Sequence, residues 1–176
     1  AEAERAGLRG AVELLAEGYG VKKSSVSRHW KRLTAGKVRE LCERRLDDRD
    51  WVVLVVDSKG FGEWTVTVAL GVDTSGHKQV LGLWQGSSEN SAVCTKLFED
   101  LIERGLDPGR PRLYVLDGSK ALKKAVRKVF GEDAPIQRCQ AHKRRNVKAH
   151  LPLEHQAEVD RRLLAAYGMR GYEEAK

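Results

Sequence analysis

The spacing of hydrophobic and polar positions changes near residue 50, which divides the chain into a helical part and a part rich in strands. Before that point the pattern predicts two short helices around a glycine-bearing turn in residues 9–33 and a charged amphipathic helix in residues 35–49. Beyond it, alternation and short apolar runs are typical of strands. Three strands are predicted, at residues 51–57, 64–72 and 78–85, with a hairpin turn at residues 73–76.

The second half of the chain alternates between helical and strand patterns. The remaining elements are a helix at 89–104, a strand at 112–117, a helix at 119–130, a strand at 135–139 and a basic helix from about residue 141. Ser119 is a suitable N-cap for the second of these helices. Three antiparallel strands followed by helix, strand, helix and strand are typical of an RNase H-like fold. The sequence therefore predicts an α/β protein with a mixed sheet, its later strands parallel and flanked by helices.

Two of the predicted strands are followed by an aspartate. Residues 51–56 form an unbroken apolar run, which suits a strand buried on both faces, and Asp57 follows it directly. The stretch at 112–117 is a second short apolar run that stops on Asp117. Aspartate is a common turn former, so either residue alone has an ordinary explanation. A right-handed crossover through the helix at 89–104 would place both strands side by side and both carboxylates at one edge of the sheet.

Paired carboxylates at a sheet edge indicate metal-dependent phosphoryl transfer. Mg²⁺ prefers oxygen ligands, and two such ions can hold the attacking and leaving oxygens of a phosphodiester in line. The short aspartate side chain keeps its oxygens close to the rigid strand. We therefore predict that Asp57 and Asp117 are catalytic and bind Mg²⁺ or Mn²⁺, in a two-metal site in the complete enzyme.

The helical part before residue 50 resembles a helix-turn-helix. Residues 11–16 form a helical run, residues 18–20 break it, and Ser24 would cap a second helix. In a helix-turn-helix, the second helix lies in a DNA groove. The predicted DNA-binding residues of this helix are Ser25, Arg28, His29, Lys31 and Arg32. The alternative is an ordinary helical hairpin with a solvated basic face.

Composition and charge narrow the class of protein. The 176-residue chain has a net charge of +7, and its basic residues gather at residues 22–32 and 138–148, which favours a polyanionic partner. Three widely spaced cysteines argue against a disulfide framework and for a reducing cytoplasm. The longest aliphatic run, residues 52–56, is far too short to cross a bilayer. The start of the chain has neither the apolar region of a secretory signal nor a Met, which is expected of a piece cut from a longer polypeptide.

Four segments carry a resemblance to a known family. They are VVDSKGFG (55–62), VALGVDTSGHKQVLGLWQGSSEN (68–90), YVLDGSKAL (114–122) and QRCQAHKRRN (137–146). Together they resemble transposases of the bacterial insertion-sequence group related to the plant Mutator elements. The resemblance covers about residues 20–176, and several motifs in the same order make it more specific than any single motif. It implies an RNase H-like core with a catalytic triad of two aspartates and a glutamate (DDE).

The resemblance assigns roles to individual residues. The matching residues are Asp57 and Asp117 for the two aspartates, Cys139 and His142 for a C-x-x-H motif, and Arg145 and Asn146 for the Arg-Asn that follows it. Residues expected to support the site are Cys139, His142 and Asn146, and those expected to contact DNA beside it are Lys143, Arg144 and Arg145.

The glutamate of the triad has no match in this chain. The family places it on a helix beyond a helical insertion, and the chain stops at Lys176, within that insertion. The acids in this region, which lack the matching context, are Glu154, Glu158, Glu173 and Glu174. We therefore assign no catalytic glutamate. The chain is expected to carry an incomplete active site, as a fragment or a degenerate copy of a transposase, and to be inactive alone.

The C-x-x-H motif also suggests zinc. A structural zinc site needs about four ligands, usually supplied by two pairs. Cys139 and His142 form one pair, whereas His150 and His155 fall on a helical stretch interrupted by Pro152. Zinc is therefore disfavoured. We expect Cys139 to pack near the end of the fifth strand, and His142 to lie near the metal site or the DNA backbone.

Three functions compete at this point. The leading hypothesis is a transposase, or a fragment of one, that cuts element ends with metal-activated water and joins the freed 3′-hydroxyl to target DNA. The alternatives are a non-catalytic DNA-binding remnant and an RNase H-like nuclease with another substrate. A glutamate-bearing helix after Lys176 would separate the first from the second.

The expected organisation follows from these assignments. Residues 1–49 would be the DNA-binding segment, residues 50–150 the partial catalytic core, and residues 151–176 the start of the helical insertion. The expected partners are the terminal repeats of an element, target DNA and, in the active state, other copies of the chain. No membrane is involved, and the expected location is the bacterial cytoplasm, at the nucleoid.

Overall fold

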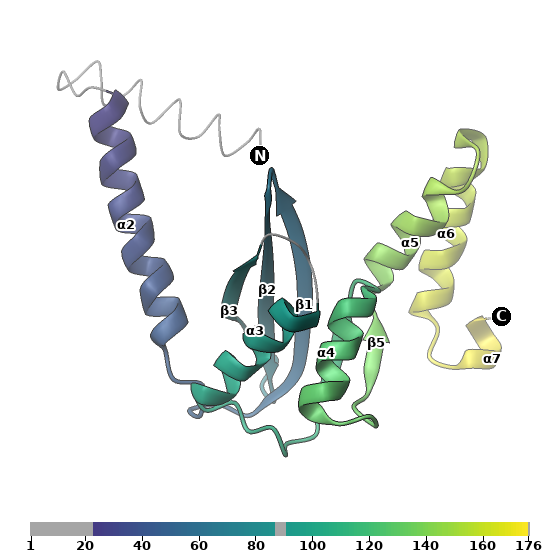
Figure 1. The fold of residues 1–176 in the computed structure, drawn as a ribbon. Helices are drawn as coiled ribbons and strands as arrows, with labels where there is room; N and C mark the ends of the chain where they lie inside the picture. The colour runs from purple at the N-terminus through teal and green to yellow at the C-terminus, as the bar shows by residue number, and fades with distance from the viewer. Residues whose placement is uncertain (1–22, 87–90, 176) are drawn as a thin grey trace. The chain divides into compact units, whose positions relative to one another are not determined.

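The computed structural model describes residues 23–86 and 91–175 (Figure 1). The chain divides into two units, Ala1–Arg44 and Arg45–Lys176. In the first unit the structure describes one helix, α2 (Lys23–Glu43). In the second unit, the described residues form five strands and five helices.

The helix α2 replaces two elements of the sequence prediction. The prediction of a helix at 24–33 followed by a separate helix at 35–49 is wrong. Helix α2 continues past Gly36 without interruption and ends at Glu43. A single glycine inside a helix costs only about 1 kcal/mol relative to alanine and does not end it. Ser24 lies inside α2 and not at its N-cap. The first helix and the turn of the predicted helix-turn-helix lie outside the described residues.

The second unit is built on a five-stranded mixed sheet with the order β3-β2-β1-β4-β5. The strands are β1 (Trp51–Phe61), β2 (Trp64–Asp73), β3 (Lys78–Gly86), β4 (Leu113–Leu116) and β5 (Ile136–Arg138). The first three pair antiparallel, β4 runs parallel to β1, and β5 runs parallel to β4. The predicted mixed sheet, with three antiparallel strands followed by parallel ones, is confirmed.

The helices of the second unit follow the predicted order. They are α3 (Ser91–Glu103), α4 (Lys120–Phe130), α5 (Gln140–Ala149), α6 (Leu153–Gly168) and α7 (Tyr172–Ala175). The predicted cap of α4 is confirmed, since the Ser119 hydroxyl accepts a hydrogen bond from the Leu122 amide at 3.2 Å. Within the described ranges, no helix combines the length and the apolar character needed to span a membrane.

One face of the sheet is packed against α3 and α4, which lie on the same side of it in Figure 1. Leu54 and Val56 of β1 are buried there, whereas Val53 and Val55, which alternate with them, are only half-buried on the opposite face. The aromatic part of this core joins three elements: α3 Phe98 and α4 Phe130 have ring centroids 5.4 Å apart, and β4 Tyr114 lies 4.9 Å from Phe130. Burial raises the pKa of Tyr114 to about 12.

The predicted hairpin turn at residues 73–76 is confirmed. Asp73 Oδ1 accepts hydrogen bonds from the Ser75 amide at 2.9 Å and the His77 amide at 3.0 Å, and Gly76 takes the left-handed φ of 82° that the turn requires. Hydrogen bonds from the Ser75 hydroxyl and from Arg49 hold the pKa of Asp73 well below its usual value. The carboxylate of Asp73 therefore holds the turn that joins β2 to β3.

Strand β1 is longer than the sequence indicates. It continues beyond Asp57 to Phe61, and this extension pairs only with β2, where Asp57 stands opposite Val68 and Phe61 opposite Trp64. The prediction that the strand stops on Asp57 is therefore wrong. The polar side chains in this extension do not reveal that its backbone amides and carbonyls pair with β2. What stops near Asp57 is the pairing with β4, whose last register pair is Val56 and Leu116.

Candidate functional site

Asp57 and Asp117 follow the last register pair of two adjacent parallel strands. In β1 and β4 that pair is Val56 and Leu116. Asp57 is the next residue of β1, and Asp117 directly follows the end of β4. Neighbouring strands lie about 4.8 Å apart, so the two backbones are adjacent at this edge of the sheet. The predicted placement of β4 beside β1, with a helix crossing between them, is confirmed.

The backbone around each aspartate restricts its carboxylate. The Ser58 amide donates a hydrogen bond to Asp57 Oδ1 at 3.0 Å, and the Ser119 amide donates one to Asp117 Oδ1 at 2.8 Å. Alternation along β1 places Asp57 on the face opposite the one that α3 and α4 cover. Asp57 is exposed and Asp117 half-buried, so a ligand can reach both carboxylates from solvent.

His142 lies beside the first aspartate. Its Nε2 is 3.7 Å from Asp57 Oδ1, and its side chain is 29% exposed. The C-x-x-H spacing accounts for this position: the Cys139 amide donates a hydrogen bond of 2.6 Å to the Leu116 carbonyl, which ties the start of α5 to the end of β4. Cys139 follows β5 directly and occupies the N-cap of α5, so His142 lies in the first turn of that helix.

Arg138, which the sequence analysis did not single out, packs on the turn after the second aspartate. Gly118 has a φ of 108°, and a Cβ built on it would lie 2.8 Å from Arg138 Nε. A glycine is therefore required for the arginine to lie against this turn. Arg138 belongs to the segment QRCQAHKRRN, but an arginine at a strand end has no spacing that reveals which turn it contacts.

The basic residues of α5 differ in their surroundings. Arg144 forms two hydrogen bonds to Asp160 of α6, at 3.0 and 2.8 Å, and this contact raises the pKa of Arg144 and lowers that of Asp160. Its guanidinium therefore joins α5 to α6. Lys143 and Arg145 are exposed, as is Asn146.

The other predicted DNA-binding residues belong to α2. These residues are Ser25, Arg28, His29, Lys31 and Arg32, and all of them lie within the one helix Lys23–Glu43. Arg28 is exposed. The predicted second helix of the helix-turn-helix is thus part of α2, whereas its first helix and turn lie outside the described residues.

The donor set at the sheet edge fits a hard divalent cation. Asp57 and Asp117 supply carboxylate oxygens, the ligands that Mg²⁺ and Mn²⁺ prefer. Across residues 23–86 and 91–175, no group of three or more His, Cys, Asp or Glu side chains is arranged to hold a metal ion. The described residues therefore offer two ligands from the strands, with His142 beside one of them.

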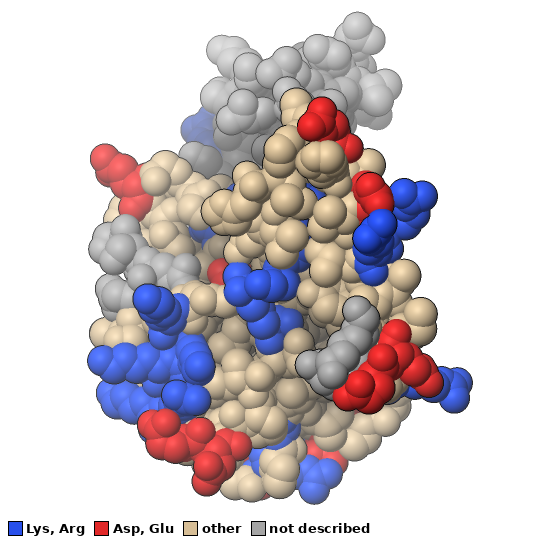
Figure 2. All heavy atoms as spheres, turned by 90° about the vertical axis from the view of Figure 1, so that its right-hand side faces the viewer, with Lys and Arg blue, Asp and Glu red and all other residues tan. Residues whose placement is uncertain are grey.

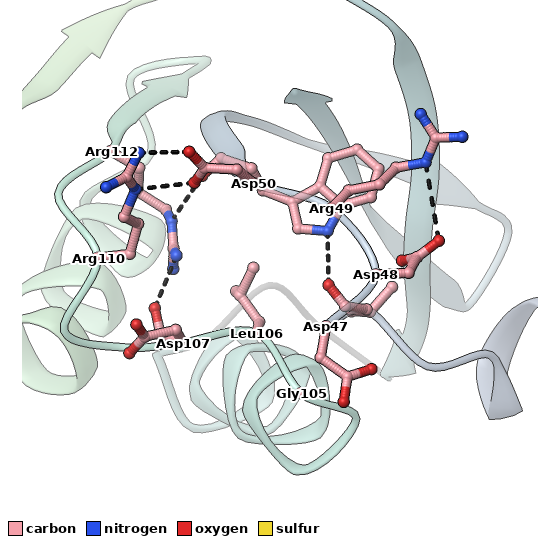
Figure 3. Close-up of a pocket in the computed structure, with 11 residues that line it drawn as sticks. Asp47, Asp48, Arg49, Asp50, Gly105, Leu106, Asp107, Arg110 and Arg112 are labelled. Carbon is pink, nitrogen blue, oxygen red and sulfur yellow. Dashed lines mark hydrogen bonds and ion pairs between the residues drawn. The ribbon is translucent and has the colours of Figure 1, made fainter. Parts of the chain in front are cut away.

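A second polar region, at the opposite end of β1, is a network of ion pairs (Figure 3). It lines a cavity of about 370 Å³. The Arg110 guanidinium donates a hydrogen bond from Nε to Asp50 Oδ1 at 2.8 Å. The Arg112 guanidinium donates hydrogen bonds to the Asp107 carbonyl at 2.6 Å and to the Trp51 carbonyl at 3.3 Å. These contacts join the loop before β1 to the loop before β4. They lie at the end of β1 away from Asp57.

The strand order and the two aspartates together define an RNase H-like protein with a candidate metal-binding edge. A family model described as "Transposase, Mutator family" matches residues 7–176. The chain belongs to this family of insertion-sequence transposases, which confirms the resemblance seen in its four segments.

Curated relatives are transposases of bacterial insertion sequences. The chain is 32% identical over 149 residues to the transposase of IS6120 from Mycolicibacterium smegmatis, covering 80% of this chain and 44% of the relative. It is 30% identical over 124 residues to that of IS1201 from Lactobacillus helveticus (67% and 33%), and 29% identical over 167 residues to that of ISRM5 from Rhizobium meliloti (90% and 41%). The chain thus spans less than half the length of each of these relatives.

Among solved structures, a chain from the cryo-EM structure of the simian T-cell lymphotropic virus intasome in complex with PP2A regulatory subunit B56 gamma gives a TM-score of 0.35. The sequence identity is 11%, and the match covers 89% of this chain and 68% of that one. A similarity of this size adds no argument, so the fold assignment rests on the strand order of the chain itself.

Proposed function

We propose that this chain contributes two metal-binding aspartates and DNA-binding surfaces to an insertion-sequence transposase that cuts and joins DNA by metal-dependent phosphoryl transfer. The observation that carries the proposal is the register of β1 and β4, which brings Asp57 and Asp117 to one sheet edge from positions sixty residues apart. Membership in the Mutator transposase family supports the reaction class.

The roles of the residues at this edge follow from their contacts. A bound divalent cation would supply Lewis-acid activation of the phosphodiester. Asp57 and Asp117 would hold it, and the Ser58 and Ser119 amides keep each carboxylate in one orientation. His142, whose Nε2 is 3.7 Å from Asp57 Oδ1, would orient that carboxylate. It would also contact a phosphate oxygen of DNA that approaches the site from the side of α5.

DNA is the proposed substrate and partner. Exposed Lys143 and Arg145 on α5 lie within three residues of His142 along the chain, so a DNA backbone at the carboxylates would come within their reach. Arg28 of α2, also exposed, supplies a basic contact from the first unit. Arg144, in contrast, contributes mainly by joining α5 to α6, so its removal should weaken this helix pair as well as any DNA contact.

The chain on its own is expected neither to cleave nor to join DNA. Two cations at one site need enough carboxylate to offset their mutual repulsion. The described residues bring only Asp57 and Asp117 together, with no third acid beside them. Losing one ligand from such a site should lower the rate on the order of a thousandfold. The measurement is a strand-cleavage and strand-transfer assay of residues 1–176 on element-end DNA with Mg²⁺ or Mn²⁺.

The complete reading frame that encodes these residues is the positive control in that assay. Activity of the complete protein alone would support the proposal. Inactivity of both proteins would favour the non-catalytic DNA-binding remnant. Robust activity of residues 1–176 that Asp57→Ala abolishes would contradict it, and would show that an acid of this chain, such as Glu154 or Glu158, completes the triad.

A further inference from the structure

The outward side of α4 carries only cations. Its exposed positions, called here the α4 basic stripe, are Lys120, Lys123, Lys124, Arg127 and Lys128. The positions between them face the core, where Leu122, Ala125 and Val126 are buried. In the view of Figure 2, Lys and Arg side chains gather at the lower left, on the side of the second unit where α4 lies.

An amphipathic helix needs a polar outer side, but it does not need one of a single charge. Two other helices of this unit mix their charges: α3 exposes Lys96 and Glu99, and α6 exposes Glu158 beside Arg162, at 2.5 Å. Helix α5, which exposes Lys143 and Arg145, is basic like α4. Like charges three and four residues apart on a helix repel each other and destabilise it. The α4 basic stripe therefore carries an electrostatic cost that a bound polyanion would relieve.

The stripe begins at the candidate active site. Only Gly118 and Ser119 separate Asp117 from the first residue of α4. A hollow of about 340 Å³ beside this turn is lined by Gly118, Ser119, Lys123, Arg127 and Arg138, together with apolar side chains. Among the described residues, the stripe forms an ion pair with Glu132, whose carboxylate is 3.6 Å from Arg127. A continuous basic surface thus leads from the Asp117 turn along α4.

The dimensions of the stripe match one strand of a DNA duplex. From Lys120 to Lys128 the helix rises about 12 Å, at about 1.5 Å per residue. Phosphates of one B-DNA strand follow each other at about 3.4 Å along the duplex axis, so this length corresponds to about three or four phosphates.

We propose that the α4 basic stripe binds the sugar-phosphate backbone of the DNA duplex whose strand reaches Asp57 and Asp117. The proposal rests on the function proposed above and adds a contact surface outside the residues assigned there. Its contacts are with phosphates, so they position the duplex without reading its sequence. An acidic protein segment is the competing partner, and the experiment separates the two.

The test measures binding of the full 176-residue chain to a 25-base-pair duplex of arbitrary sequence as salt is varied, a length of about two turns chosen to exceed the stripe. The variant is Lys123→Gln/Lys124→Gln/Lys128→Gln. Its matched control is Lys78→Gln/Lys96→Gln/Arg161→Gln, which removes the same charge from exposed positions on β3, α3 and α6. Each phosphate contact contributes about 0.9 to the slope of log affinity against log salt. We expect the variant to bind on the order of tenfold to a hundredfold more weakly at 0.1 M salt, with a slope reduced by about 3, and the control to change little.

A second measurement locates the contact. Acylation of lysines, read by mass spectrometry, should be slowed by bound duplex at Lys123 and Lys124 and unchanged at Lys78 and Lys96. Unchanged affinity and slope in the variant, while the wild-type chain binds the duplex, would overturn this inference and leave the proposed function standing. Failure of the wild-type chain to bind the duplex at 50 mM salt would count against both. Protection by polyglutamate but not by duplex would identify an acidic protein as the partner and contradict the inference.

Discussion

Replacing either Asp57 or Asp117 by asparagine lowers DNA strand transfer by the complete protein on the order of a thousandfold or more. Asparagine keeps the size of the side chain and its ability to accept the hydrogen bond from Ser58 or Ser119, but it removes the negative charge that holds a divalent cation. Because the register of β1 and β4 places the two aspartates at one edge, the loss should be similar for both variants. The measurement is the rate of strand transfer under single-turnover conditions.

The matched control is Asp133→Asn, since Asp133 is an exposed aspartate in the loop before β5. It should leave the rate within about twofold, as expected of a surface change away from the site. The melting temperature of each variant shows whether the fold is intact. Strand transfer at wild-type rate in a folded Asp57→Asn or Asp117→Asn protein would contradict the assignment of that aspartate.

Leu54→Ala should strongly destabilise the second unit. Leu54 is fully buried in the middle of the sheet, where its register partners are Gly71 of β2 and Tyr114 of β4. Truncating a buried leucine to alanine removes apolar contacts and leaves a cavity, which costs about 2–5 kcal/mol. The measurement is the free energy of unfolding from urea denaturation of the 176-residue chain.

The same substitution on β4 provides the comparison. Leu113 is 38% exposed and pairs with Val53, on the face of the sheet that α3 and α4 do not cover. Leu113→Ala should therefore cost less than about 1 kcal/mol. Equal losses at the two positions would mean that both faces of the sheet are packed alike, against the arrangement described here.

The strands of the sheet could be predicted because short apolar runs, side-chain alternation and turn residues mark them directly. The hairpin at Asp73–Gly76 is a local signal, and the Ser119 cap is another, and both are confirmed. The extension of β1 could not be predicted in this way, because its polar residues pair through their backbone with β2. The division of residues 24–43 between two helices is wrong, since α2 is continuous and its one internal glycine, Gly36, costs too little to end a helix.

The candidate site was predictable for a similar reason. An apolar run that ends in an aspartate is visible in the sequence, and a crossover helix between two such runs indicates that they are neighbours. The contacts that complete the site are tertiary. Neither the packing of Arg138 on Gly118 nor the pairing of Arg144 with Asp160 has a spacing that reveals it, because each joins residues from different elements.

Binding of Mn²⁺ to the 176-residue chain, followed by electron paramagnetic resonance and by calorimetry, shows whether Asp57 and Asp117 form a metal site. We expect one bound ion, with affinity reduced at least about tenfold in Asp57→Asn and in Asp117→Asn, since each removes one carboxylate ligand. Asp133→Asn should bind as the wild type does. Mn²⁺ binding that is unchanged in both aspartate variants would contradict the claim that these residues form a metal site at the edge of the sheet.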